Sequence, residues 1–368
     1  MLKKILKIVA ALLVLLVVVI GVVILINEND KAVIEKYVSN EKLKTVKPNW
    51  QGTPVDGKNR FVNYEYPFLS RISDLLKWQL GTNPQADEKK NDAARLEVKD
   101  PTEFLNGEKD GILWLGHASF YIRLGGKTVL LDPVFGKPPF VKTFVDVPSP
   151  LEKIKRVDYV LLSHDHRDHC DETTLKSIAQ RFPNAKFFAG LRMEELLKDW
   201  TTATNEIQTA GWFQQFDTPD APVKITFLPV RHWCRRGLFD MNHKLWGGYV
   251  IEAAGTTIYF SGDSGYGAHY KETAEIFPKI DYFLIGIGAY SPRWFMEPNH
   301  NSPEDAVKAF VDAKAEILIP MHYGTFDLSD EPPSEPLELL KQDAAKQNLS
   351  DRIKPLAINE SVILHNEN

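Results

Sequence analysis

The feature that most constrains the fold is a histidine- and aspartate-rich stretch in the middle of the chain, from His164 to His169. It directly follows residues 157–162, an apolar run that is typical of a buried strand. Alternation in an extended segment points His164 and His166 to the same side, and a following turn brings Asp168 and His169 towards a second position. Imidazole and carboxylate groups together suit zinc and similar divalent ions. The stretch therefore predicts a site for two metal ions, with a solvated polar loop as the alternative.

Composition indicates a globular protein with ample core: the 368 residues are 43% hydrophobic and 25% charged. The net charge of -5 gives no indication of a nucleic-acid partner. The only two cysteines, Cys170 and Cys234, exclude a disulfide framework. Both lie beside candidate ligands, so we expect buried residues of the site wall; the alternatives are a metal ligand or a disulfide partner.

The N-terminus, residues 1–27, predicts a single membrane-spanning helix. Three lysines precede an uncharged run, 8–26, whose roughly 19 residues reach about 28 Å as a helix, enough to cross the hydrocarbon core. A cleaved signal peptide is the alternative, but the run is long and no small-residue cleavage site follows it. Basic residues before the span and Glu28 and Asp30 after it predict a cytoplasmic N-terminus, with the catalytic domain on the extracytoplasmic side.

Residues 28–106 are polar and mixed but rich in aromatic side chains, so we expect an extension that packs on the main domain rather than a free linker. Contact of these aromatics with lipid headgroups is the alternative. Helical patches are expected around 32–38 and 68–80.

Residues 107–368 alternate strand-like and helix-like segments in two similar halves, which predicts an α/β fold with two sheets sandwiched between helices, an αββα arrangement. Strands are expected at 111–120, 119–124, 127–131, 157–162, 186–189, 223–230, 248–253, 256–261, 280–287, 317–320 and 361–364, and helices at 175–181, 193–200, 303–313 (capped by Ser302) and 335–347. Three further strand ends carry His232, Asp263 and His322, as expected of a site built on a rigid scaffold.

These motifs resemble the metallo-β-lactamase superfamily, which has an αββα sandwich and usually binds two zinc ions. Within it, the sequence is most similar to the N-acyl-phosphatidylethanolamine-hydrolysing phospholipase D group. Related lactonases and uncharacterised hydrolases share many of these motifs. The similar short sequence motifs lie at residues 60–63, 115–118, 231–236, 245–247, 259–266, 292–296, 300–307 and 322–326.

The resemblance implies that His164, His166 and His232 hold one metal. It assigns Asp168, His169 and His322 to the second metal and makes Asp263 a bridging ligand, so Asp168 and Asp263 belong to the catalytic centre. Two Zn²⁺ are implied, although the same donors accommodate Mn²⁺ or Fe²⁺. A hydroxide shared by the metals is the expected nucleophile.

Other residues are assigned supporting roles. His300 is the candidate for contacting the phosphate or protonating the leaving group, and a surface histidine capping the next helix is the alternative. His117 and Asp132 are expected to orient ligands from outside the ligand set, although His117 could equally form a plain buried hydrogen bond. An apolar substrate groove, with ordinary core packing as the alternative, is expected from Trp233, Tyr290, Trp294, Phe295 and Met296.

The resemblance implies a membrane-anchored phosphodiesterase of a phospholipid. The implied reaction converts N-acyl-phosphatidylethanolamine to N-acylethanolamine and phosphatidic acid. Hydrolysis of a lactone, another cyclic ester or a β-lactam on the same metal pair is the first alternative. A non-catalytic interaction module at the membrane is the second, but it predicts missing ligands, and the full set is present.

Overall fold

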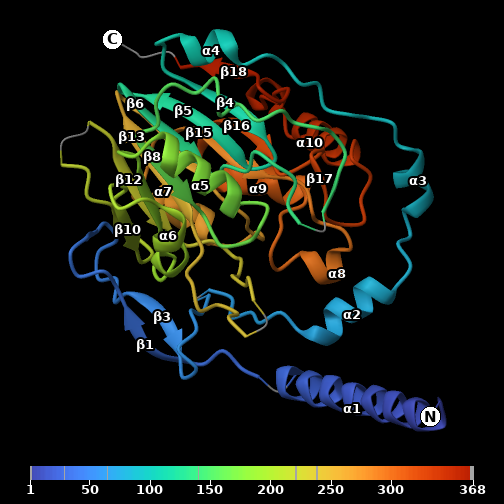
Figure 1. Ribbon diagram of the computed structural model, residues 1–368. Helices are drawn as coiled ribbons and strands as arrows, with labels where there is room; N and C mark the ends of the chain where they lie inside the picture. Colours follow the sequence, from blue (N-terminus) through green and yellow to red (C-terminus); the bar gives the residue numbers. More distant parts are fainter. Residues whose placement is uncertain are drawn as a thin grey trace.

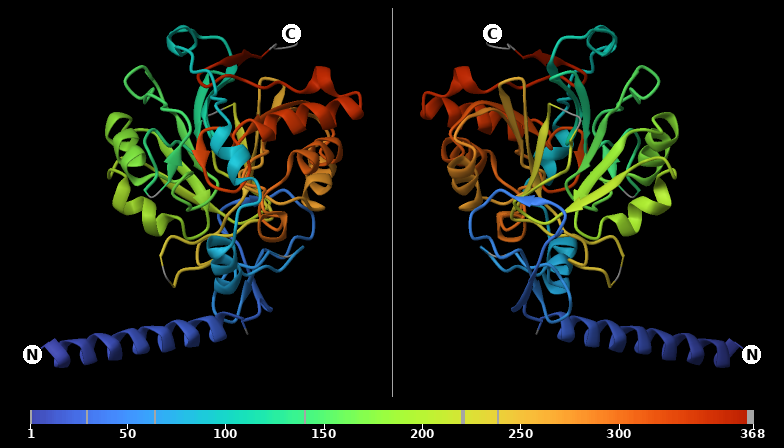
Figure 2. Two further views of the ribbon diagram at one scale, coloured as in Figure 1. Left: turned by 90° about the vertical axis from the view of Figure 1, so that its right-hand side faces the viewer. Right: turned by 90° about the vertical axis from the view of Figure 1, so that its left-hand side faces the viewer.

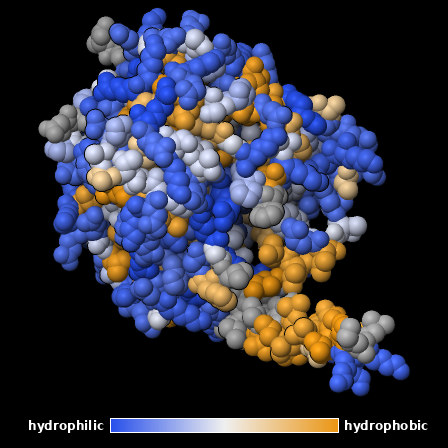
Figure 3. Space-filling view, viewed as in Figure 1, coloured by the Kyte–Doolittle hydropathy of each residue, from blue (hydrophilic) through white to orange (hydrophobic). Residues whose placement is uncertain are grey.

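A computed structural model describes residues 2–28, 30–63, 65–139, 141–219, 222–237 and 239–364, without the side chains of residues 2, 20 and 23–28. Helix α1 (Leu2–Glu28) projects from the rest of the molecule, and its described apolar side chains face outwards (Figures 1 and 3). Counting only side chains that are described, no helix reaches both the length and the hydrophobicity needed for a membrane span. The anchor at 1–27 therefore stays a prediction.

Two mixed seven-stranded sheets lie face to face at the centre of the molecule (Figures 1 and 2). Each combines antiparallel hairpins with parallel strands, and the parallel strands direct their carboxyl ends to the same edge. The first sheet runs β10 (Ile207–Ala210), β9 (Lys186–Gly190), β8 (Tyr159–Leu162), β6 (Lys127–Leu131), β5 (Ser119–Leu124), β4 (Gly111–Gly116) and β18 (Ser361–Ile363). The second runs β16 (Ala315–Met321), β15 (Ile280–Gly286), β14 (Thr256–Phe260), β13 (Gly248–Ala253), β12 (Lys224–Leu228), β11 (Gln214–Gln215) and β2 (Lys44–Thr45).

Helices cover both outer faces, which confirms the predicted αββα sandwich (Figure 2). The core between the sheets is built from large apolar side chains such as Trp114, Phe120, Phe227 and Phe260, all buried. A second cluster packs beneath the helices of the first sheet. The helices of the first sheet are α5 (Glu172–Arg181) and α6 (Glu194–Trp200), and those of the second are α7 (His269–Ile276), α9 (Pro303–Asp312) and α10 (Glu335–Lys346).

The described residues of the segment 28–106 run along the main domain and contact it at several points. Strand β2 pairs with β11 at the edge of the second sheet, and the Trp78 ring stacks on Phe295 with centroids 5.2 Å apart. The helix expected around 32–38 is wrong: this segment is strand β1, which pairs with β3. The remaining elements are β1 (Ile34–Val38), β3 (Thr53–Asp56), α2 (Ile72–Leu80), α3 (Ala86–Asn91), α4 (Thr102–Asn106), β7 (Lys142–Thr143), α8 (Arg293–Met296), β17 (Phe326–Asp327) and the 3₁₀ turn Ser350–Arg352.

Candidate metal centre

The seven predicted ligands gather at one edge of the sandwich, where strands of both sheets end. The loop after β8 supplies His164 to His169, and the loop after β12 supplies His232. Asp263 follows β14, and His322 follows β16. The sandwich thus brings together side chains that are up to 158 residues apart, the separation between His164 and His322.

A first group of donors consists of His164, His166 and His232. His166 Nδ1 lies 2.9 Å from His164 Nε2 and 3.2 Å from His232 Nε2. The other ring nitrogens of two members have partners: His164 Nδ1 is 2.8 Å from Ser163 Oγ, and His232 Nδ1 is 3.1 Å from the Asn299 carbonyl oxygen. Those partners set the ring orientations, so three imidazole nitrogens converge.

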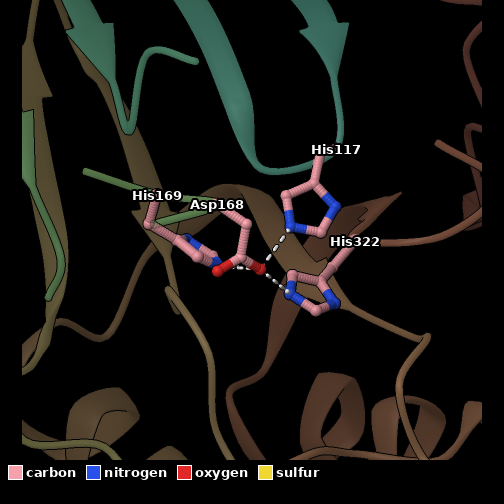
Figure 4. Close-up of side chains that lie close together, drawn as sticks. All are labelled: His117, Asp168, His169 and His322. Carbon is pink, nitrogen blue, oxygen red and sulfur yellow. Dashed lines mark hydrogen bonds and ion pairs between the residues drawn. The ribbon is translucent and has the colours of Figure 1, made fainter. Parts of the chain in front are cut away.

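A second group contains His117, Asp168, His169 and His322 (Figure 4). Asp168 Oδ2 lies 3.5 Å from His169 Nε2 and 3.7 Å from His322 Nε2. His117 Nε2 is 3.0 Å from the same oxygen. This contact allows His117 to orient Asp168, and the supporting role expected of His117 stays a prediction.

Asp263 lies between the two groups. Its Oδ2 is 3.1 Å from His322 Nε2 and 3.2 Å from His169 Nε2. The same oxygen is 3.8 Å from His232 Nε2 and 4.0 Å from His164 Nε2. One carboxylate oxygen therefore faces imidazoles of both groups, as a bridging ligand requires.

Glycine permits this position for Asp263. Gly262 has φ of +57°, and a Cβ atom there would lie 2.9 Å from the Ser163 Cβ. The turn before Asp263 therefore packs directly against the start of the histidine-rich loop.

Asp132 lies behind this loop and is fully buried. Its Oδ1 accepts a hydrogen bond from Ser163 N at 2.7 Å, and its Oδ2 accepts from Ser163 Oγ at 2.5 Å. Oδ2 also lies 2.8 Å from His169 Nδ1. Asp132 therefore directs His169 Nε2 towards Asp168 and Asp263, in line with its predicted orienting role.

Electrostatics favour a cation at this position. Burial holds the pKa of His164 and His232 well below the usual value, so both are neutral and available as ligands. Burial lowers the pKa of His322, but Asp263 and Asp168 raise it to about 9 overall. A bound metal would displace that proton.

Unpartnered donors also fit a metal. Among the described residues, Asp263 Oδ1 is buried without a hydrogen-bond partner, and His169 Nε2 and His322 Nε2 have ion-pair contacts with Asp168 and Asp263 but no hydrogen bond. Such groups are costly to bury unless something binds them. The donor set of imidazoles and carboxylates therefore fits two zinc-like ions.

His300 faces the same centre. Its side chain is 16% exposed, and Nδ1 lies 3.8 Å from Asp263 Oδ2. The capping alternative is wrong, because Ser302 caps α9 with Asp305 completing a capping box. Burial lowers the pKa of His300 to about 4, so the ring is neutral near pH 7 and can donate a hydrogen bond from one nitrogen.

The predicted groove residues divide into two kinds. Trp233, Trp294 and Phe295 are partly exposed, and the Trp233 ring lies 4.7 Å from that of His166. Tyr290 and Met296 are buried, and the Tyr290 hydroxyl donates to Glu335 Oε1 at 2.5 Å. These two therefore pack beneath the surface instead of lining an open groove.

The sequence did not reveal a cavity of about 300 Å³ beside His117. Apolar side chains from the loop after β6 dominate its lining, and Phe326 closes one side with its ring 4.6 Å from His117. No sequence pattern indicated this cavity, because most of its lining residues come from an irregular loop without a motif. The other apolar lining residues are Leu115, Val134, Phe135, Val145, Val147 and Pro148.

Both cysteines are free and buried, which fits the predicted wall residues and excludes a disulfide between them. Among the residues with a described position, neither belongs to a group able to hold a metal.

Comparisons with known proteins agree with this geometry. Residues 127–323 match the family model described as a beta-lactamase superfamily domain. The chain is 30% identical over 322 residues to the N-acyl-phosphatidylethanolamine-hydrolyzing phospholipase D 1 of Caenorhabditis elegans, covering 83% of this chain and 90% of that protein. It is 31% identical to a UPF0173 metal-dependent hydrolase of Hyperthermus butylicus, and the match covers 61% of this chain and 88% of that protein.

Solved structures share the fold. Igni18, a metallo hydrolase from the archaeon Ignicoccus hospitalis, superposes with a TM-score of 0.54 at 22% identity, covering 70% of this chain and 99% of that one. The fold and site define a metal-dependent hydrolase. The chain belongs to the metallo-β-lactamase superfamily, and N-acyl-phosphatidylethanolamine-hydrolysing phospholipases D are among its relatives.

Proposed function

We propose that the protein is a dinuclear zinc phosphodiesterase of the phospholipase D type, acting on N-acyl-phosphatidylethanolamine. The observation that carries this proposal is the position of Asp263, whose Oδ2 lies within 4.0 Å of four imidazole nitrogens from both donor groups. His164, His166 and His232 would hold one ion, Asp168, His169 and His322 would hold the other, and Asp263 would serve as a ligand to both.

When bound, two zinc ions supply Lewis acidity that lowers the pKa of a shared water and offsets charge on phosphate oxygens. Attack of water on phosphorus breaks the bond to the ethanolamine oxygen, which leaves as N-acylethanolamine after gaining a proton. The other product is phosphatidic acid. His300, neutral and facing Asp263, is positioned to donate a hydrogen bond to the phosphate.

Two observations support a lipid substrate. The named activity of the C. elegans relative is hydrolysis of N-acyl-phosphatidylethanolamine, and its similarity covers most of both chains. The apolar cavity beside His117 and the partly exposed Trp233 ring, 4.7 Å from the ring of His166, provide apolar surface next to the centre.

Attachment to a membrane is part of the same proposal. Its support is the uncharged run 8–26 and the exposure of the described apolar side chains of α1, with Val17 at 67%. We propose a single pass with the N-terminus in the cytoplasm and the catalytic domain on the extracytoplasmic side. Alkaline extraction of membranes tests attachment. A reporter that works only in the cytoplasm can be fused to the C-terminus, and activity of that reporter would contradict this orientation.

The activity is tested with zinc-loaded protein and vesicles containing N-acyl-phosphatidylethanolamine, with both products measured by mass spectrometry. Wild type and Asp343→Asn, a partly exposed carboxylate of α10 that pairs with Lys346, are expected to release equal amounts of both products. Asp263→Asn should lose at least about 100-fold in turnover. Lactone cleavage by the wild type without phosphodiester cleavage would overturn the choice of substrate.

A further inference from the structure

Residues 60–63, 65 and 66 of the N-terminal extension lie across the two loops that carry His232 and Asp263. Phe61 N donates a hydrogen bond to the Asn242 carbonyl oxygen at 2.7 Å. The buried Asn63 side chain donates from Nδ2 to the Val230 carbonyl oxygen at 3.0 Å, two residues before His232. The extension therefore contacts the backbone of a ligand-bearing loop directly.

Glu65 reaches the other loop. Its carboxylate accepts hydrogen bonds from Ala268 N at 2.5 Å and from His269 N at 3.2 Å, at the start of α7. Ala268 is the N-cap residue and has no side chain able to accept from these amides. Glu65 thus supplies from a distant part of the chain the cap that α7 lacks, and its charge suits the positive end of the helix dipole.

His269 links this cap to the metal centre. It is 2% exposed, and its Nδ1 lies 3.6 Å from Glu65 Oε2. On its other side, Nε2 lies 3.1 Å from Ser264 Oγ, which also accepts a hydrogen bond from Arg231 N at 3.0 Å. Ser264 and Arg231 directly adjoin Asp263 and His232 in the sequence. The contacts therefore run from Glu65 to the backbone next to both ligands.

The two ligand loops are also joined to each other at this point. Gly265 N donates to the Arg231 carbonyl oxygen at 2.9 Å, and the Arg231 guanidinium lies 4.1 Å from the Tyr66 ring centre. Arg231 also donates from Nη1 to the Tyr266 carbonyl oxygen. Residues 60–63, 65 and 66 thus cover the junction between the two loops.

We propose that Glu65 is a positioning residue for the metal centre. Acting through His269 and Ser264, it holds His232 and Asp263 in place relative to each other. The consequence is that the extension completes the metal site although it contributes no ligand. This inference rests on the metal-binding part of the proposed function and not on the choice of substrate.

The test measures zinc affinity, by competition with a chelator, for wild-type protein, Glu65→Ala and Glu65→Gln. Removing a group that orients metal ligands typically weakens metal binding by 10- to 100-fold, so Glu65→Ala is expected to lose at least about 10-fold. Glu65→Gln keeps an acceptor for the helix amides but loses the charge facing His269. We expect the zinc affinity of this variant to fall about 3-fold. If Glu65→Ala does not fold, Glu65→Gln alone provides the test.

Asp92→Ala is the matched control. Asp92 is another carboxylate of the extension that accepts from a main-domain amide next to a helix start, Ser334 N at 2.9 Å. Both alanine variants should lower the melting temperature, by roughly 2–4 °C each. Only the Glu65 variants should bind zinc more weakly.

The outcomes separate the two proposals. Wild-type affinity in both Glu65 variants overturns the positioning role, as does equal weakening in Asp92→Ala, because the effect is then one of general stability. A wild-type protein that binds no zinc overturns the proposed metal centre itself.

Discussion

His169 Nδ1 and Asp132 Oδ2 lie 2.8 Å apart, and both side chains are completely buried. The pair holds the imidazole in one orientation, with Nε2 towards Asp168 and Asp263. Because Asp132 also binds the backbone and hydroxyl of Ser163, one carboxylate supports both ends of the histidine-rich loop.

Replacing Asp132 should therefore impair metal binding without removing a ligand. Asp132→Ala leaves three buried donors without their acceptor, so we expect zinc affinity to fall by about 10- to 100-fold and the free energy of unfolding by about 3 kcal/mol or more. Chelator competition and urea titration measure the two effects. Asp146→Ala, a surface carboxylate paired with Lys137, is the control; unchanged zinc affinity in Asp132→Ala would refute the supporting role.

His300→Ala tests the contact with the phosphate. With metal content verified to match the wild type, kcat should fall by about 100-fold, because a donor directed at the reacting group is lost. His243→Ala, a histidine outside both donor groups, should leave kcat unchanged. Full turnover in metal-loaded His300→Ala would exclude this role.

Trp294 tests the approach of lipid to the centre. Its ring is 49% exposed, beside Phe295, with the Lys77 ammonium 4.3 Å from its centre. Trp294→Ala should raise KM for vesicle substrate several-fold and leave kcat for a soluble phosphodiester unchanged. Val311→Ala removes an equally exposed apolar residue from α9 and should change neither value. A loss confined to the soluble substrate would contradict a lipid-contacting role.

The thiols should be inert in the folded protein. Burial raises the pKa of Cys170 and Cys234, so little reactive thiolate forms at pH 8. A thiol reagent should detect no group in native protein and two after unfolding, the total in the sequence. Rapid labelling of the native protein would show that one of them is accessible.

The gathering of the candidate metal ligands was predictable because the sequence patterns that indicate it are local. His164 to His169 form one motif after a recognisable strand, and the other ligands also follow apolar runs. The sandwich followed from the alternation of strand-like and helix-like segments.

The secondary-structure predictions failed where contacts with distant parts of the chain determine the local structure. Residues 32–38 have apolar spacing compatible with a helix, but pairing of β1 with β3 favours a strand. Helix α7 was not predicted, because its sequence is polar and lacks a capping residue of its own. Its cap is Glu65, about 200 residues earlier, and no local pattern indicates that contact.

Three residues of the centre, His117, Asp132 and His322, have φ values of +49°, +37° and +62°. Conformations of this kind cost a side-chain-bearing residue roughly 1–3 kcal/mol each. Bound metal offsets that strain in the folded state only, so the folded fraction rises with the concentration of free metal. In a cell short of the metal, newly made chains would then be more exposed to proteases, and supply of the ion would influence the abundance of the protein as well as its activity.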